Sequence, residues 1–351
     1  MFETVVLDVA GVPLAHTRCT LNAGAEQAVR NASFDIAWNG PGLPCDEDAS
    51  CTITVGEELW LTGVTRDVNW SHDEGNRTYS LTVVSATADA TETSIDHPTG
   101  YMENCDLKGI AAEFDTAKIG VECDIKTEKK AVHQINPGDT LFQTLETEAR
   151  ANGALLYDTP KGKLKITDKP EGRHAGALVK GVNIKKASGT LSGRFNYSEV
   201  KVRGQASFGT TGTALSPEAE AKGTADRKRT LIIYHEGEAT SERLKKRAGW
   251  EAKRSAGKGK AASITVPGWR DTAGKLYAPN FLISVIDEWG GLEQDMIIAS
   301  VAFSQVGDDG AGTEATLTLK DPRALGGENP RGKSAKGWSA PAVTSPSFRE
   351  D

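Results

Sequence analysis

Residues 58–85 read ELWLTGVTRDVNWSHDEGNRTYSLTVVS, and this stretch decides the fold that we expect for the chain. β-Branched and aromatic residues dominate its first part, residues 59–68. Residues 71–76 are typical of a turn, because Gly75 can adopt a positive φ. Apolar and polar residues then alternate over residues 78–83, which is the period of a half-buried strand. The stretch therefore predicts a long antiparallel hairpin.

A similar plan recurs in DMIIASVAFSQVGDDGAGTEATLTLKD at residues 295–321. Residues 296–303 predict the outgoing strand, residues 307–312 the turn, and the alternation from Ala315 to Leu319 the returning strand. One hairpin plan used twice in a chain indicates an internal repeat. The sequence therefore predicts two related antiparallel β domains.

The N-terminal part of the chain carries further strand signals and no convincing helix. Residues 2–12 predict a first strand that ends at Pro13. Alternation over residues 34–38 predicts a second strand, and residues 53–55 predict a third before the long hairpin. Antiparallel strands without helices predict a sandwich or barrel, which we expect to end near Ile95.

A small α/β domain is expected next, after the boundary at residues 96–98 (Asp-His-Pro). Residues 107–114 are weakly helical, and residues 131–135 predict a short strand. Residues 154–168 predict a hairpin that turns at residues 159–162, where a proline and a glycine lie. This piece is interpreted as an insertion between the two β domains.

One helix of this insertion has clear start and stop signals within NPGDTLFQTLETEARANG, residues 136–153. Thr140 and Gln143 have the spacing of a capping box, and Gly153 stands where a C′ glycine belongs. Apolar residues recur on one face of this segment. The sequence therefore predicts a helix between these two signals.

Strand signals return from Leu178 onward, while residues 204–229 are interpreted as a long exposed loop. Thr240 or Ser241 is expected to begin a second helix. This helix is basic and should extend to about Ser255. The strands expected in this half, besides the second hairpin, are residues 195–203, 231–234, 264–266 and 281–286.

Composition places the chain among soluble proteins with more than one domain. It has 351 residues, 38% hydrophobic content and a formal net charge of -7, and its 37 glycines fit a turn-rich β protein. A chain of this length can form two or three domains with their own cores. The negative net charge argues against a general nucleic-acid binder, which would carry a basic face.

Cysteine usage and targeting signals point to a protein made in the cytoplasm. The cysteines are odd in number and contain no Cys-x-x-Cys pair, so we interpret them as reduced thiols and not as metal ligands. No signal peptide is expected, and no stretch reaches the ~20 apolar residues of a membrane span. The cysteines are Cys19, Cys45, Cys51, Cys105 and Cys123.

Three motifs suggest binding functions that the surrounding sequence does not support. Residues 327–334 (GENPRGKS) match the Walker A pattern, but the residues that follow cannot form the helix that a phosphate loop requires. The Gly-Asp-Thr-Leu stretch at residues 138–141 is similar to the start of a LysM module, yet a hairpin takes the place of the second LysM helix. The basic run at residues 245–247 is typical of a solvated helix face.

No catalytic constellation is predicted. The histidines are scattered, and no carboxylate pair stands in an apolar setting that would separate two pKa values. We therefore predict that the protein is not an enzyme and has no catalytic, cofactor-binding or metal-binding residues. The histidines are His16, His72, His97, His133, His174 and His235.

The chain from about Thr4 to Leu325 resembles the baseplate hub protein of contractile phage tails, particularly its Mu-like branch. Related proteins are phage late control protein D and the hub part of type VI secretion spike proteins. The resemblance rests on shared segments in a shared order, with Tyr277 and Ala278 before the Pro-Asn pair as a mild departure. These segments are GDTLFQTLETEARANGALLYDTPKGKLKI, RFNYSEVKVRG and VPGWRDTAGKLYAPNFLISVIDEW.

This resemblance implies a mainly β protein, α+β by its insert, with two barrels similar to tail-tube subunits. The implied domains are a first barrel at residues 1–98, an α/β insert at 99–176, a second barrel at 177–235 with 259–325, a basic helical insertion at 236–258 and a flexible C-terminal tail at 326–351.

It also implies a structural role in the virion. Three copies would form a homotrimeric ring between the tail tube protein and the trimeric tail spike protein, in contact with other baseplate proteins. DNA would pass through the ring without specific binding, and no stable membrane association is implied. The protein would be made and assembled in the host cytoplasm. Two alternatives stay open: a peptidoglycan-binding, LysM-like tail protein and a tail-associated cell-wall hydrolase.

Overall fold

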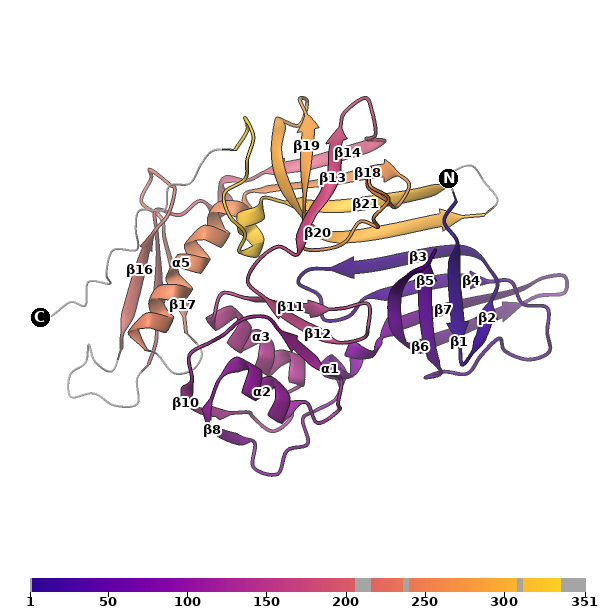
Figure 1. Cartoon of the computed structure of the whole chain (residues 1–351), viewed down its shortest axis with the longest axis horizontal. Helices are drawn as coiled ribbons and strands as arrows, with labels where there is room; N and C mark the ends of the chain where they lie inside the picture. Colours follow the sequence, from indigo (N-terminus) through magenta and orange to yellow (C-terminus); the bar gives the residue numbers. More distant parts are fainter. Residues whose placement is uncertain (1, 206–215, 236–239, 308–311, 336–351) are drawn as a thin grey trace, which may run out of the picture.

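The computed structural model describes residues 2–205, 216–235, 240–307 and 312–335 (Figure 1). The chain is mainly β, as predicted. One large sheet runs across the molecule, a unit with helices α1 to α3 lies at one side of it, and helix α5 with a small sheet lies at one end (Figure 1).

Both predicted hairpins are confirmed. The first pairs β6 (Glu58–His72) with β7 (Arg77–Ser85), and the second pairs β20 (Leu292–Val306) with β21 (Thr313–Lys320). Each outgoing strand carries a bulge, at Arg66 in β6 and between Ile298 and Ser300 in β20. Part of the second predicted turn, residues 308–311, lies outside the described residues.

The first half of the sheet departs from the sequence prediction at its start. The expected strand over residues 2–12 is wrong, because Ala10 (φ 52°) and Gly11 (φ 85°) form a turn that divides it. Pro13 lies inside the second of the two short strands and does not end the first. The strands of this half, besides the hairpin, are β1 (Val5–Val9), β2 (Val12–Leu14), β3 (His16–Gly24), β4 (Asn31–Ile36) and β5 (Ser50–Val55).

The second half repeats much of this arrangement. Strand β18 pairs with β21 as β4 pairs with β7, and β19 pairs with the start of β20 as β5 pairs with the start of β6. The predicted repeat is therefore present in the strand pairing. The strands of this half, besides the hairpin, are β13 (Gly172–Val179), β14 (Lys186–Leu191), β18 (Lys260–Pro267) and β19 (Phe281–Asp287).

The two halves share one sheet. The end of β20 pairs with β3 from Ser300↔Gly24 to Val306↔Arg18, and in Figure 1 these two strands lie side by side at the centre. Among the described residues, thirteen strands follow the order β14-β18-β21-β20-β3-β4-β7-β6-β5-β1-β2, with β19 on β20 and β13 on β19. This order does not close on itself among the described residues, so the two barrels that we expected are not confirmed.

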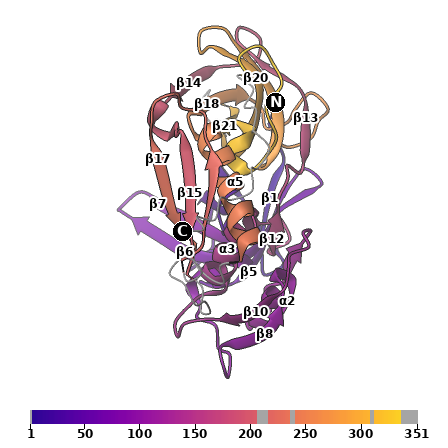
Figure 2. The same ribbon diagram turned by 90° about the vertical axis from the view of Figure 1, so that its left-hand side faces the viewer.

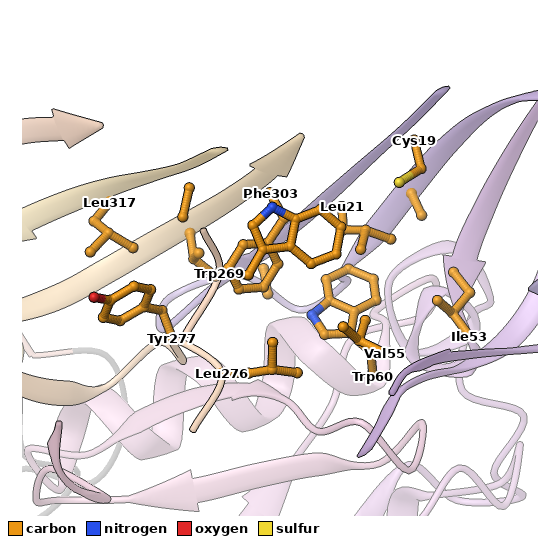
Figure 3. Packing of buried hydrophobic residues seen from close by; sticks show 14 of the residues in the cluster. Cys19, Leu21, Ile53, Val55, Trp60, Trp269, Leu276, Tyr277, Phe303 and Leu317 are labelled. Carbon is orange, nitrogen blue, oxygen red and sulfur yellow. The ribbon is translucent and has the colours of Figure 1, made fainter. Parts of the chain in front are cut away.

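One hydrophobic core follows from the shared sheet. Trp269 is fully buried, and its ring stacks on Phe303 with 4.9 Å between ring centroids. Its indole nitrogen donates to the backbone oxygen of Glu314 at 2.9 Å. Figure 3 shows Trp269 and Phe303 of the second half beside Leu21 and Trp60 of the first.

The middle unit has the predicted capped helix and hairpin. Thr140 and Gln143 form the capping box at the start of α3, and Gly153 (φ 71°) follows its end. Strands β11 and β12 form the hairpin, whose Asp158 accepts from Arg30, the residue before β4, at 2.7 Å. The elements are η1 (Ala86–Ala88), α1 (Asp89–Glu92), β8 (Tyr101–Cys105), α2 (Leu107–Phe114), β9 (Val121–Cys123), β10 (Lys130–Gln134), α3 (Leu141–Ala151), β11 (Leu155–Asp158) and β12 (Leu164–Thr167).

A second α/β unit stands between β14 and β18. The expected loop over residues 204–229 contains a strand, β16, and the strands expected in the second barrel at residues 195–203 and 231–234 lie in this unit instead. The basic helix α5 packs on the small sheet through Leu244 and Ala248 (Figure 2). The elements are η2 (Gly193–Phe195), β15 (Glu199–Arg203), β16 (Glu218–Lys222), β17 (Thr230–Tyr234) and α5 (Ser241–Lys258).

The chain continues past η3 (Pro322–Leu325) along the beginning of β20. The backbone nitrogen of Asp295 donates to the backbone oxygen of Arg331 at 2.8 Å. Within the expected flexible tail, residues 331–334 hydrogen-bond to the sheet, because β20 has an open position there. Residues 336–351 of that expected tail lie outside the described residues.

We predict that Trp269→Ala destabilises both halves together. Removing a buried tryptophan from a shared core costs about 3–5 kcal/mol of unfolding free energy. Urea denaturation followed by circular dichroism should show one transition, shifted to lower urea. Trp289→Ala is the matched control, because Trp289 is 87% exposed and its loss should change stability by less than about 0.5 kcal/mol. Two separate transitions for Trp269→Ala would contradict a common core.

Candidate functional site

The large sheet has two faces of different character. One face carries the apolar side chains of the common core. Over the central strands the other face carries mostly short polar side chains that are half-buried or exposed. Near Ile297 a second buried cluster covers this face. Strand alternation produces this separation, because residues that pair directly across the sheet point to the same side. The residues of this face, which we call the open face, include Thr20, Asn22, Ser33, Ser80, Thr82, Ser263, Thr265, Ser300, Ala302, Ser304, Thr316 and Thr318.

The few charges on the open face are balanced. Over the central strands, namely β14, β18, β21, β3, β4, β7 and the ends of β20 and β6, the register places three basic and three acidic residues on this face, and some are paired with neighbours. Glu314 forms an ion pair with Lys185, and Lys320 forms one with Glu26 at 3.1 Å. Balanced and paired charges leave little net field over the face. The six charged residues are Arg18, Lys186, Lys320, Asp35, Asp67 and Glu314.

Among the unpaired edges of this sheet in the described part of the chain are β14 and the end of β6. Strand β14 ends the sheet on one side, and every one of its residues is exposed. Strand β6 loses its partner β5 at Val64, so its end has only β7 beside it. Exposed apolar side chains lie at both edges, namely Trp70 on β6 and Leu191 on β14. Open edges with apolar side chains are typical of surfaces that pair with another chain.

A buried His–Asp pair in the second half has a structural role. His174 Nδ1 donates to Asp271 Oδ2 at 2.9 Å, and its Nε2 accepts from the backbone nitrogen of Ala278 at 3.1 Å. Burial lowers the pKa of His174 against the opposing effect of Asp271, so the ring is neutral. Both ring nitrogens are engaged, which leaves neither to activate a nucleophile. The pair holds β13 against the segment before β19.

A second buried group of charges lies in the middle unit. Lys130 and Glu148 form an ion pair, and His133 Nδ1 lies 3.4 Å from Glu148 Oε1. Burial alone would raise the pKa of Glu148, but hydrogen bonds and charge from His133 and Lys130 lower it to about 2. His133 Nε2 also lies 2.9 Å from Thr144 Oγ1. These contacts join β10 to α3 inside the unit.

The cysteines behave as predicted for reduced thiols, since the structure contains each as a free cysteine. Burial raises the pKa of the Cys19 and Cys51 thiols to about 12, so neither is a ready nucleophile. In the described part of the chain, no group of three or more His, Cys, Asp or Glu side chains is arranged to hold a metal ion.

The Walker-like residues 327–334 do not form a phosphate loop. A 3-10 helix precedes them, where the motif needs a buried strand. Lys333 Nζ pairs with Glu293 Oε1 at 2.6 Å, and Ser334 Oγ accepts from the backbone nitrogen of Glu293 at 2.8 Å. The lysine and serine of the pattern therefore bind β20.

The other two motifs also have structural partners. The LysM-like helix α3 buries Leu141 and Leu145 in the core of the middle unit, and β11 follows it where a LysM module has a second helix. In the basic run of α5, Lys245 pairs with Glu242 at 3.0 Å and Arg247 with Glu251 at 2.9 Å. These basic side chains stabilise the helix through neighbours on its own surface.

Sequence reasoning missed the two strands that matter most for this site. It predicted neither β3 nor β14, although β14 is an open edge and β3 joins the two halves. Strand β14 reads KASGTL, with a glycine and a single large apolar residue, so it lacks the alternation that marks a half-buried strand. The repeat was the available signal, since β14 stands beside β18 as β3 stands beside β4.

Comparisons with known proteins place this repeated, bulged sheet among the structural proteins of bacteriophage tails. Two family models agree with this class. One is described as Mu phage baseplate assembly protein GpP, fourth domain, and matches residues 240–328. The other is described as baseplate hub protein gp44-like, second domain, and matches residues 87–168.

Solved structures place the chain more narrowly. A 43 kDa tail protein of prophage MuSo2 from Shewanella oneidensis is 32% identical, with a TM-score of 0.78 over 92% of this chain and 99% of its own. A tail protein from Neisseria meningitidis is 19% identical, with a TM-score of 0.74 over 93% and 100%. The chain therefore belongs to the family of Mu-like phage baseplate hub and tail proteins.

A more distant structure shares the fold alone. It is an E. coli component of the type VI secretion system, described as structurally similar to the T4 tail proteins gp27 and gp5. It is 10% identical, with a TM-score of 0.54 over 96% of this chain and 79% of its own. The curated proteins contain no match to the sequence. None of the helices described here is long and apolar enough to cross a membrane.

We predict that Glu148→Gln destabilises the protein by about 3–5 kcal/mol at neutral pH, because it leaves Lys130 buried without its counter-charge. Glu146→Gln is the control on the same helix, and its half-exposed pair with Arg150 contributes at most about 0.5 kcal/mol. Urea denaturation of the three proteins gives the comparison.

The pH dependence of this effect has a defined sign. The pKa of Glu148 is about 2 in the folded protein against an ordinary 4.5, so its contribution is complete above pH 4.5 and is lost as the pH falls toward 2. The stability difference between the native protein and Glu148→Gln should therefore shrink across that interval. A difference that stays constant down to pH 2.5 would contradict the ion pair.

Proposed function

We propose that this protein is the structural hub of a phage baseplate, a homotrimeric ring between the tail tube and the central spike. The observation that carries the proposal is the repeat: one chain contains two related β halves, joined edge to edge by β20 and β3. Unpaired edges remain at β14 and at the end of β6. A chain whose sheet can be continued at both of these edges by further copies is suited to a closed ring.

Three copies are the number that the repeat favours. Rings of six similar units are the tail-tube arrangement that the family resemblance implies. Three chains with two halves each present six such units, and they keep a three-fold axis for a trimeric spike. This arrangement would convert six-fold symmetry on the tube side to three-fold symmetry on the spike side.

The open face fits the wall of the channel in such a ring. Its short serine, threonine and asparagine side chains give a smooth surface, and its charges are balanced. DNA held by lysine and arginine releases counterions and binds tightly, which would stop a genome in transit. A wall without net positive charge lets the polymer pass without specific binding.

The inserted units would lie outside this channel and serve other contacts. We propose the middle unit, residues 86–167, and the unit around α5 as surfaces for other baseplate proteins. The protein is then a non-enzymatic part of the virion tail that is assembled in the host cytoplasm. No observation favours the peptidoglycan-binding or hydrolase alternatives, since the LysM-like helix is buried in its own unit.

We expect light scattering on the purified protein to give trimers in equilibrium with monomers. The reason is that three chains close the ring, whereas two leave edges open. The measurement is the molar mass across a concentration series, repeated with the cognate spike protein. A stable dimer, or a chain that stays monomeric even with the spike, contradicts the proposal.

A second expectation concerns DNA. Because the open face is neutral, a mobility-shift assay at moderate salt should detect no binding of double-stranded DNA at submicromolar protein. Replacing Ser300 and Thr316 with lysine provides the comparison, since two added positive charges per chain on that face should create binding that salt weakens. Submicromolar binding by the native protein would overturn the assignment of this face to the channel.

A further inference from the structure

The two halves of the chain correspond residue by residue, and their bulges fix the alignment. In β20 the register shifts between Ile298 and Ser300, and in β6 it shifts between Thr65 and Asp67. When the two bulges are aligned, β20 is the equivalent of β6, and Ser300 is the equivalent of Asp67. Strand β19 then ends its pairing with β20 at the position where β5 ends its pairing with β6.

The same alignment extends across each half sheet. Ala262 of β18 and Ala32 of β4 occupy equivalent positions in the two halves. The next strand outward is β14 beside β18 and β3 beside β4. Gly189 pairs with Ala262 as Leu21 pairs with Ala32. Strand β14 is therefore the equivalent of β3.

Only one of the two equivalent junctions is made within the chain. The end of β20, from Ser300 onward, pairs with β3 of the other half. The end of β6, from Asp67 to His72, has no partner on that side, and β14 has none on its outer side, among the residues that the structure describes. The repeat thus leaves two strand edges unpaired: the end of β6, which is equivalent to the end of β20, and β14, which is equivalent to β3.

We propose that the end of β6 in one chain pairs antiparallel with β14 of a second copy, in the register of the internal β20–β3 junction. This inference rests on the proposed ring and names the contact that closes it. Transferring the internal register, where Phe303 pairs with Leu21, places Trp70 opposite Gly189. The same register places Ser71 opposite Ser188.

The core-side residues at this junction are complementary. Trp70 is 59% exposed in the single chain and shares a face with Tyr79, which packs against the core. Gly189 has no side chain on that face, so it leaves room for the indole. Beside it Leu191 is 65% exposed and would meet Val68.

A cavity on the second copy receives this side chain. It has a volume of about 700 Å³ and opens along β14 beneath Gly189. Its walls include Ala262, Ile264 and Leu292 of the core and the exposed Trp289. In the internal junction the equivalent of Trp70 is Phe303, which is fully buried in the core. Lys180, Lys186 and Asp287 also line the cavity. An aromatic side chain that enters such a cavity and packs on its apolar wall is the kind of contact that dominates interface energies.

The open-face residues at the junction are complementary as well. The register brings Asn69 opposite Thr190 and Ser71 opposite Ser188, which are short polar pairs like those elsewhere on that face. Just beyond the end of β6, Asp73 would lie opposite Lys186, and an acidic residue opposite a basic one favours this register. The junction would therefore continue both the core and the open face from chain to chain.

Disulfide trapping tests the register. Directly opposed residues of an antiparallel pair have Cα atoms about 4.5–5.5 Å apart, within the range of a disulfide. Ser71→Cys with Ser188→Cys should therefore give cross-linked dimers and trimers under mild oxidation. Asp67→Cys with Ser188→Cys is the matched control, because those positions would be four residues out of register, or about 13 Å. The native protein, with its five cysteines, gives the background.

The outcomes separate this inference from the ring itself. Cross-links in the matched pair alone support the register. A protein that light scattering finds trimeric, but whose matched pair gives no cross-link, overturns the register and leaves the ring standing. A protein that is monomeric at every concentration and with the spike overturns both. Equal cross-linking of the matched and mismatched pairs also overturns the register.

A second variant measures the aromatic contact. Trp70→Ala should weaken self-association by on the order of tenfold or more, because it removes the side chain that fills the cavity. Ile232→Ala is the control, since Ile232 is 52% exposed on β17 and lies away from both edges. Circular dichroism should show both variants folded. Unchanged association of Trp70→Ala would overturn the contact.

Discussion

The structure depends on the pairing of β20 with β3. Strand β20 is 15 residues long, and it pairs with β19 at its start, with β3 at its end and with β21 on its other side. A strand that changes partner along its length must bend, and the bulge at Ala299 lies where the change occurs. Because residues far apart in the chain meet at this seam, neither half can complete its core alone, and Trp269 packs on Phe303 where the two halves join.

This constraint determines where the inserted units can stand. An insertion into a sheet strand would break the seam, so both units enter at connections between strands. The unit around α5 occupies the connection between β14 and β18, which is a short turn at the equivalent β3–β4 position. The middle unit occupies the connection between the two halves, and Arg30 ties it to the sheet through Asp158. Each unit has a core of its own, so its burial is satisfied locally.

Local sequence patterns were sufficient to predict the hairpins. The rest of the sheet depends on pairing between residues far apart in the chain. The alternation after Gly75, the capping box at Thr140 and the glycine at residue 153 each act within a few residues, so sequence reasoning could find them. The seam could not be found in this way, because its register depends on residues 18–24 and 300–306 meeting across the chain. Strand β14 has no alternation to find, since neither of its faces is buried in one copy. Strands β15 and β17 were predicted but assigned to the second barrel, and β16 was missed because it is short and charged.

The unpaired backbone groups at the strand edges are both a risk and a means of assembly for this fold. An open edge with an exposed tryptophan invites uncontrolled pairing, and soluble proteins usually block such edges with charge, bulges or cover. Here the bulge at Arg66 does not block the edge of β6, because it bends the strand just where a new partner can begin, as the bulge at Ala299 does for β3. Only a surface with an equivalent of β3 can continue that register, and β14 is the one strand edge left with that geometry in the part of the chain described here. Specificity then comes from the repeat itself: the internal seam is the template, and a second copy carries the complementary edge. Such a head-to-tail contact leaves the same two edges free at each step, so it stops growing only when the ring closes.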